Sequence, residues 1–276
     1  MTESRSRKRL ASFFLFFLAL LIIVSLSLGE VRMPEASGDS VKKNGDLVVD
    51  CSHMDQGYVM VKGKKTKKKL KVRVKANGGE TSLNYDLNSD GEYECFPLQF
   101  GSGKYVIALY MNASGKKYSE EGKIGLNASM EDPNSCFLYP NQYVNYNENT
   151  ACVVTATELC KDMTDQAQIY KAVCDYIKGN FVYDFVKSVS VKAGQLPDID
   201  GCWEKHMGIC QDLSAVTIAM LRSQGIPARL MIGTLGANTY HAWVTAVVNG
   251  EEKFFDPTAE LNASSKTDTY TTERYY

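Results

Sequence analysis

The sequence has no excess of charge of either sign: 31 basic and 32 acidic residues give a formal net charge of −1 at pH 7. Nucleic-acid-binding domains usually present a strongly basic face, so this balance argues against nucleic acid as a partner. Internal repeats and low-complexity segments are missing, and no acidic loop of the EF-hand type occurs. We therefore predict an ordinary globular chain without cofactor or metal, with room for two modest domains.

The N-terminus carries an export signal. A basic cluster at residues 5–9 precedes an uncharged apolar stretch over residues 10–28. The stretch is long enough to cross a bilayer as a helix, and only a poor small-residue cleavage site follows it. Residues 1–29 are thus either a cleaved signal peptide or a membrane anchor. In both cases the basic flank stays in the cytoplasm, so the protein is exported, either anchored with its C-terminus outside or secreted.

Eight cysteines are compatible with an outward location, where thiols oxidise to disulfides. If Cys210 must stay reduced, the seven others form an odd set that cannot pair completely. We expect a disulfide between Cys51 and Cys95, because both fall in the N-terminal domain.

The distribution of strand and helix signals divides the rest of the chain. Residues 30–40 form a polar tether, and residues 41–131 hold short β-branched or aromatic strands separated by turns, which predicts a small all-β, sandwich-like domain. The basic residues between 62 and 75 are interpreted as the solvated face of one strand and a hairpin before it. Residues 132–150 form a linker, and residues 151–276 form the second domain.

In the second domain, helices precede strands, which predicts an α+β fold. Thr164 is the expected cap of a helix that Gly179 ends. An irregular stretch is expected over residues 187–208. A second helix follows, with apolar residues at helical spacing after Cys210.

Cys210 therefore sits at a helix N-terminus, where unpaired backbone N–H groups and the helix dipole stabilise a thiolate. The same N–H groups could contribute to an oxyanion hole. Taken alone, a single cysteine is better explained as a small buried apolar residue.

His241 is placed by a hairpin. Asn249-Gly250 between apolar runs predicts a two-residue loop, which pairs Val248 with Glu251. Asp256 then faces Trp243 and lies diagonally next to His241, about 7–8 Å away at the backbone and within side-chain reach. A helix-terminal cysteine, a downstream histidine and an orienting carboxylate are the groups that thiol acyl transfer needs.

Four motifs in this order resemble the transglutaminase-like family of papain-like thiol enzymes over residues 164–260. They are Gly208-Ile209-Cys210-Gln211-Asp212, Gly225-Ile226-Pro227-Ala228-Arg229, His241-Ala242-Trp243-Val244 and Asp256-Pro257-Thr258.

The resemblance implies a nucleophile helix packed on an antiparallel sheet, with Cys210 as nucleophile, His241 as proton shuttle and Asp256 as its orienting group. The layout, with a membrane segment and a β module ahead of the core, is similar to that of exported bacterial members. Where the family often has an acidic residue, this chain has Thr245. A second oxyanion donor is not identifiable from the sequence. Trp203 is a candidate, but an aromatic residue at such a position more often has a packing role.

One competing interpretation is a zinc site, because Cys202, His206 and Cys210 recur every four residues. A fourth ligand and the usual Cys-x2-Cys spacing are missing, so we do not predict it. His206 as an alternative base lacks an evident orienting partner. A reversible disulfide between Cys202 and Cys210 that masks the nucleophile is a further hypothesis.

The sequence thus predicts an extracytoplasmic enzyme that attacks amide bonds of peptides or glutamine side chains at the cell surface or wall. Transferase, peptidase and deamidase chemistry share a thioester step and stay open alternatives. A membrane partner follows only if the N-terminal helix is uncleaved. The second hypothesis is a catalytically silent surface-binding or structural protein that works through its β domain.

Overall fold

The computed structural model describes residues 31–76, 81–237, 239–262 and 269–276. The expected signal peptide or anchor over residues 1–29 lies outside these ranges. Among the helices within them, none has the length and apolar character needed to cross a membrane.

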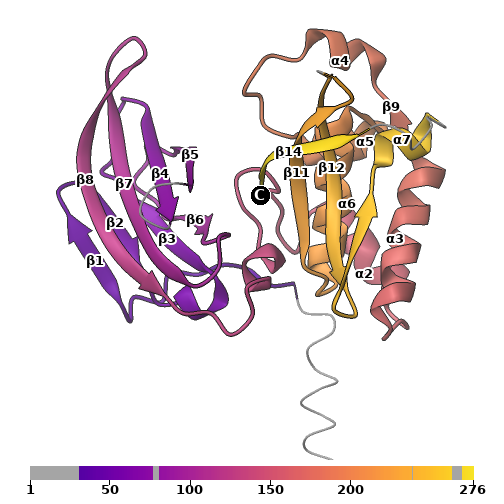
Figure 1. Ribbon diagram of the computed structural model, residues 1–276, viewed down its shortest axis with the longest axis horizontal. Coiled ribbons are helices and arrows are strands. Elements are labelled where there is room, and N and C mark those ends of the chain that lie inside the picture. The colour runs from indigo at the N-terminus through magenta and orange to yellow at the C-terminus, as the bar shows by residue number, and fades with distance from the viewer. Residues whose placement is uncertain (1–30, 77–80, 238, 263–268) are drawn as a thin grey trace, which may run out of the picture.

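The N-terminal part consists of two four-stranded antiparallel sheets, in the orders β1-β2-β3-β6 and β5-β4-β7-β8 (Figure 1). Their strands are β1 (Val41–Asn44), β2 (Leu47–Asp50), β3 (Tyr58–Lys62), β4 (Leu70–Ala76), β5 (Thr81–Leu87), β6 (Glu94–Pro97), β7 (Gly103–Ser114) and β8 (Lys117–Ala128), with a 3-10 turn η1 (Met54–Gln56) before β3. Buried residues of both sheets belong to one apolar core. The region is therefore built as two facing sheets.

Strand β4 shows why this region folds as strands. Its apolar residues alternate with Lys71, Arg73 and Lys75, and only the apolar set is buried. The basic side chains face outward, where Lys71 pairs with Asp86 at 2.7 Å. The interpretation of residues 71–75 as the solvated face of a strand is confirmed. The hairpin expected before this strand is wrong, because β3 pairs with β2 and β6 while β4 pairs with β5 and β7, so the lysines before β4 lie on a connection between two sheets.

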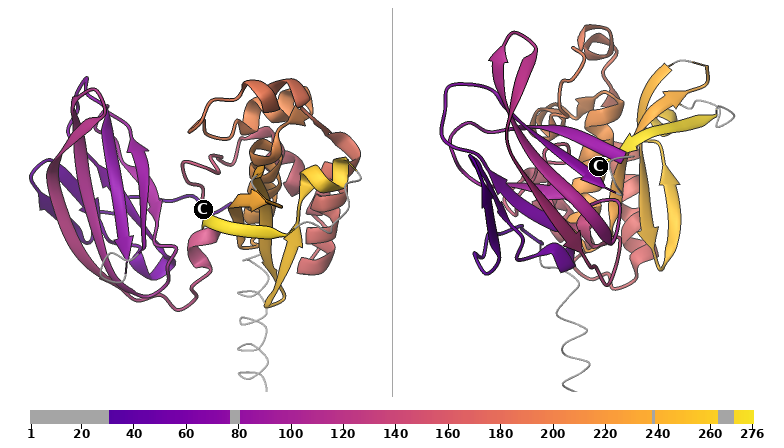
Figure 2. Two further views of the ribbon diagram at one scale, coloured as in Figure 1. Left: turned by 45° about the horizontal axis from the view of Figure 1, so that its top comes forward. Right: turned by 60° about the vertical axis from the view of Figure 1, so that its left-hand side comes forward.

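The connecting segment is fixed to the C-terminal part by a buried arginine. After the 3-10 turn η3 (Ser135–Leu138), the carbonyl of Tyr139 accepts a hydrogen bond of 2.7 Å from Arg222. Arg222 is fully buried and also donates to the carbonyls of Ala228 and Tyr276. The end of the chain therefore lies between the two parts, as Figures 1 and 2 show.

The C-terminal part is an antiparallel sheet, β13-β12-β11-β14, with helices packed around α6 on one face (Figure 1). All fourteen residues of α6 are buried, so it is the central helix of the fold. The elements are α2 (Ala151–Cys160), α3 (Gln166–Asn180), β9 (Val182–Tyr183), α4 (Phe185–Ser190), α5 (Ile199–Lys205), β10 (Met207–Gly208), α6 (Cys210–Ser223), β11 (Ala228–Leu235), β12 (Thr239–Val248), β13 (Glu251–Phe255), α7 (Pro257–Leu261) and β14 (Tyr270–Tyr275).

Local details differ from the sequence-based expectation. The cap of α3 is Asp165, whose carboxylate accepts from two backbone N–H groups, and not Thr164. The stretch over residues 187–208 is not irregular, because it contains most of α4, all of α5 and β10. These elements are short, and the apolar side chains of α4 are exposed. The sequence therefore shows no amphipathic pattern of helical spacing that would identify them.

The expected disulfide between Cys51 and Cys95 is wrong, since all eight cysteines are free thiols. Cys51 is buried in the main apolar core. Cys95 packs instead against a separate small cluster that contains Tyr58 and Met60. The two thiols therefore belong to different clusters although both lie in the N-terminal part.

Candidate active site

Cys210 is the first residue of α6, as predicted from the sequence. Its predecessor Ile209 has extended backbone angles, so the helix begins abruptly at the cysteine. The first N–H groups of a helix have no carbonyl partner within it, and the helix dipole adds positive potential there. Cys210 is 9% exposed, so its thiol experiences this potential with little water around it.

Asp212 holds this helix terminus in place. Its carboxylate is fully buried and accepts hydrogen bonds from the N–H groups of Ile209 (3.1 Å) and Asp198 (3.0 Å). It also pairs with the Nζ of Lys187 at 2.7 Å. One charged group thus joins α4, the start of α5 and the approach to α6, so the position of Cys210 depends on three segments.

Gly208 contributes to the same packing because no side chain fits there. A Cβ at this position would lie 2.6 Å from the Sγ of Cys202 and 2.9 Å from the Cβ of Asp212. The backbone leading to Cys210 therefore approaches α5 and α6 more closely than any other residue would allow.

The predicted hairpin and its register are confirmed. Val248 pairs with Glu251 and the ladder continues to Val244 opposite Phe255. Asn249 and Gly250 form the loop with φ of 52° and 80°, the left-handed conformation that a two-residue turn requires. Asp256 follows Phe255, the last paired residue of β13, and no longer belongs to the ladder. It caps α7, where its Oδ1 accepts from the N–H groups of Thr258 and Ala259.

The hairpin brings His241 and Asp256 together. Nε2 of His241 lies 2.7 Å from Oδ2 of Asp256, and the two residues are 5% and 3% exposed. Burial opposes the charged imidazolium, but hydrogen bonds and charge at Asp256 and Cys210 outweigh it and raise the pKa of His241 to about 9. Burial likewise favours the protonated form of Asp256, yet its contacts with His241, Tyr270 and the Ala259 N–H lower its pKa overall.

Cys210 also acts on the His241 imidazole, because it lies close enough to contribute to the raised pKa of the histidine. Because Asp256 occupies Nε2, Nδ1 is the ring nitrogen that remains to exchange a proton with the thiol. The structure therefore brings the three sequence-predicted residues close together, with a hydrogen bond between His241 and Asp256 and with Cys210 near enough to affect the histidine pKa. This arrangement can move a proton between sulfur and imidazole while a carboxylate stabilises the imidazolium.

Sequence reasoning missed Tyr270. Its hydroxyl donates to Oδ2 of Asp256 at 2.7 Å, and its ring packs edge-on against Trp243 with centroids 5.1 Å apart. Tyr270 opens β14, the last strand, and no motif surrounds it. Only the pairing of β14 with β11 brings it near the histidine, and that pairing leaves no signal in the sequence.

Replacing Tyr270 with phenylalanine tests this contact. The ring packing stays, but Asp256 loses one of its two partners at Oδ2, so we expect the pKa of Asp256 to rise and activity to fall about three- to tenfold. The pH profile of peptide turnover should lose its acidic side at a higher pH than in wild type. Tyr110→Phe is the control, because its hydroxyl also donates to a carboxylate, Oε2 of Glu120 at 3.4 Å, but belongs to β7 of the N-terminal part. An unchanged acidic limb would show that the hydroxyl does not influence Asp256.

The competing residues lie elsewhere. Trp203 is in α5 and stacks on Tyr176 with centroids 5.8 Å apart, so its role is packing. His206 caps α5, and its Nδ1 lies 3.1 Å from the carbonyl of Asn180. Within the described ranges, no cluster of three or more His, Cys, Asp or Glu side chains could hold a metal ion. Thr245 is buried in β12, and its hydroxyl has no hydrogen-bond partner within the described residues.

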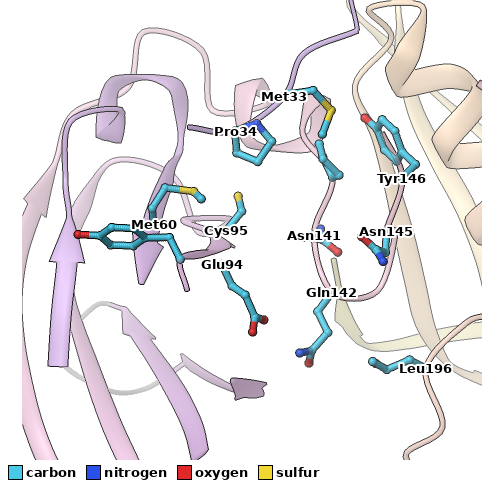
Figure 3. A pocket seen from close by; sticks show the side chains of 12 residues that line it. Met33, Pro34, Met60, Glu94, Cys95, Asn141, Gln142, Asn145, Tyr146 and Leu196 are labelled. Carbon is cyan, nitrogen blue, oxygen red and sulfur yellow. The ribbon is translucent and has the colours of Figure 1, made fainter. Parts of the chain in front are cut away.

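Two cavities lie near the junction of the two parts. The smaller, about 390 Å³, is lined by residues next to the trio, including Gln211 and Tyr240. The larger, about 510 Å³, does not contain the trio; Figure 3 shows Met60, Glu94 and Cys95 of the N-terminal part across from Gln142 and the segment around it. Parts of the loop over residues 191–197 line both cavities.

Residues 154–255 match the model of the transglutaminase-like superfamily, which confirms the resemblance and identifies this segment as a transglutaminase-like core. The matched segment contains Cys210 and His241 and ends one residue before Asp256. A comparison with curated proteins found no match.

Solved structures similar to this chain include a "putative cysteine protease" from Cytophaga hutchinsonii, with 13% identity over 79% of this chain and 91% of that one and a TM-score of 0.39. The periplasmic domain of TgpA from Pseudomonas aeruginosa has 16% identity over 83% and 78% and a TM-score of 0.39. Red sea bream transglutaminase has 13% identity over 72% and 47% and a TM-score of 0.28. These likenesses are too distant to assign an activity.

Proposed function

We propose that this chain is an extracytoplasmic thiol acyl-transfer enzyme that attacks amide bonds of peptides or glutamine side chains. The observation that carries the proposal is the buried, hydrogen-bonded pair of His241 and Asp256 close to Cys210, which lies at the N-terminus of α6. A cysteine with only a packing role would not need a buried histidine, itself held by a buried carboxylate.

The chemistry follows from the geometry. The Cys210 thiolate adds to the amide carbonyl carbon, and N–H groups in the first turn of α6 stabilise the oxygen that gains the negative charge. His241, charged at neutral pH because of its raised pKa, gives its proton to the leaving nitrogen. The C–N bond breaks, and a thioester forms on Cys210.

The second half of the reaction decides the outcome. An amine or a water molecule attacks the thioester while His241 removes a proton from it, and the thiolate of Cys210 is released. An amine gives a cross-link or a new amide, and water gives cleavage or deamidation. The cavity of about 390 Å³ next to the buried trio favours a peptide or protein substrate, and the basic and apolar N-terminal segment favours an exported location at the cell surface or wall.

Labelling with iodoacetamide tests the proposal. On the full chain at pH 7 and slightly below, we expect fast alkylation of Cys210, mapped by mass spectrometry, and slow alkylation of the other seven cysteines. The reason is that Cys210 alone combines a helix N-terminus with a histidine partner. In His241→Ala, labelling of Cys210 should slow at least about tenfold.

The other seven thiols of the same molecule serve as the internal control. Burial raises the pKa of Cys202 and Cys174 to about 12, so both should stay unmodified in wild type and variant. Slow labelling of Cys210, or a labelling rate that is the same in wild type and His241→Ala, would contradict the proposed triad and favour the binding-protein hypothesis.

A further inference from the structure

The cavity of about 390 Å³ has the composition of a substrate pocket. One wall is the loop over residues 191–197, and the other comes from the sheet, with Ile232 of β11, Tyr240 of β12 and Arg274 of β14. Gln211 lies between them and ties the loop to α6, because its Nε2 donates to the carbonyl of Gln195 at 3.0 Å.

This pocket adjoins the reactive atoms. Gln211 follows the nucleophile in α6, and Tyr240 precedes His241 in β12. Ile232 pairs with Ala242, which lies on the same face of β12 as Tyr240. Burial raises the pKa of Tyr240, and Cys210 is among the groups that raise it further, so this face lies near the nucleophile. A substrate whose carbonyl carbon reaches the Cys210 sulfur would therefore place its neighbouring groups in this pocket.

The charges that line the pocket are all positive. Lys192 and Arg274 are its basic residues, and among the described side chains that line it there is no aspartate or glutamate. The guanidinium is directed by Tyr240, whose hydroxyl accepts from its Nη2 at 3.0 Å and whose ring centroid lies 5.9 Å from its Cζ. Arg274 is thus held in a defined position and not left free to move through solvent.

Among the residues that the structure describes, Arg274 forms an ion pair with Glu273, with Nη1 and Oε2 3.3 Å apart. The side chains are 36% and 48% exposed, and ion pairs in such solvated positions contribute little. Because Glu273 does not line the pocket, the pocket keeps its positive potential. A bound carboxylate would find a planar donor and a second cation there.

We propose that this pocket binds a carboxylate of the acyl donor, so that the enzyme prefers amide bonds a short distance from an acidic side chain or a free α-carboxylate. The inference rests on the proposed function, because it assumes that Cys210 is the nucleophile. It adds the substrate class that the same site selects.

A pair of probes of nearly equal shape tests the inference without knowledge of the substrate. Iodoacetate carries a carboxylate and iodoacetamide a neutral amide, and both alkylate the same sulfur. We expect the ratio of iodoacetate to iodoacetamide rates at Cys210 to fall about three- to tenfold in Arg274→Gln and less in Lys192→Gln, because a positive charge near the reacting atoms favours the anionic probe. Raising the salt concentration should reduce the wild-type ratio.

Arg73→Gln is the matched control. Arg73 also lies over a tyrosine ring and hydrogen bonds to the hydroxyl of that residue, Tyr110, but it belongs to β4 of the N-terminal part. Its removal should leave the ratio unchanged, and Arg274→Lys should restore most of it. If the ratio is unchanged in Arg274→Gln while iodoacetamide still labels Cys210 fast, the carboxylate pocket is contradicted but the proposed function is not. Slow labelling by both probes overturns the proposed function.

Peptides distinguish the two sources of the carboxylate through their protection of Cys210 from iodoacetamide. Stronger protection by an amidated peptide with a glutamate side chain assigns the pocket to acidic side chains. Stronger protection by a neutral peptide with a free C-terminus assigns it to the α-carboxylate. Equal protection by peptides without any carboxylate, or none by those that carry one, counts against the inference.

Discussion

Replacement of Cys210 by alanine is expected to abolish amide-bond turnover, with a loss of at least about 10⁴-fold in kcat/KM. The sulfur is the atom that forms the thioester, and neither His241 nor a helix N–H group can replace it. The measurement is mass spectrometry of peptides incubated with the full chain, with and without an added amine. It detects cleavage, deamidation and amine adducts together, so the expected loss applies whichever acceptor the enzyme uses.

Cys160→Ala provides the matched control. Cys160 is also a buried cysteine in a helix, but it lies at the end of α2, outside the trio. It should retain wild-type turnover, with at most a modest loss of thermal stability from the removed sulfur. If Cys210→Ala folded normally and still turned over peptide amides at the wild-type rate, the chemistry would have to reside elsewhere in the chain.

The parts of the site that the sequence predicted are those set by local rules. An Asn-Gly turn fixes the register of a hairpin, and that register alone places Asp256 within reach of His241. The apolar spacing after Cys210 fixes where α6 begins. Both deductions involve residues that are near each other in sequence or belong to one regular element.

The parts that the sequence did not predict depend on contacts between distant segments. Tyr270 reaches Asp256 through the pairing of β14 with β11. Asp212 acts through Lys187 and the Asp198 N–H, which lie in a stretch that had been expected to be irregular. Cys51 and Cys95 share a domain but not a cluster, so common membership of a domain was a poor guide to a disulfide.

Asp256→Asn is expected to lower kcat/KM by about 10³- to 10⁴-fold while the fold is kept. Oδ1 of Asp256 caps α7 and Oδ2 accepts from His241 and Tyr270. Asparagine can keep the cap with its oxygen, but it then turns an N–H₂ group toward His241. Nε2 must become an acceptor, so Nδ1 carries the proton and can no longer take one from Cys210.

Asp165→Asn is the control, because Asp165 caps α3 in the same way without touching the trio. It should retain full turnover. Wild-type rates in Asp256→Asn would show that the charge of Asp256 has no part in the reaction.

The same substitution should change how stability depends on pH. The pKa of His241 is raised to about 9, so its interaction with Asp256 stabilises the folded state fully below the ordinary histidine pKa of about 6.5 and is lost as the pH rises through 9. At the acidic end the contribution disappears as Asp256 is protonated, below its already lowered pKa. Urea unfolding should therefore give wild type an advantage over Asp256→Asn on the order of 2 kcal/mol near pH 6 that shrinks by pH 10. An advantage that is equal at both pH values would mean that Asp256 stabilises the fold through its cap on α7 and not through a charged His241.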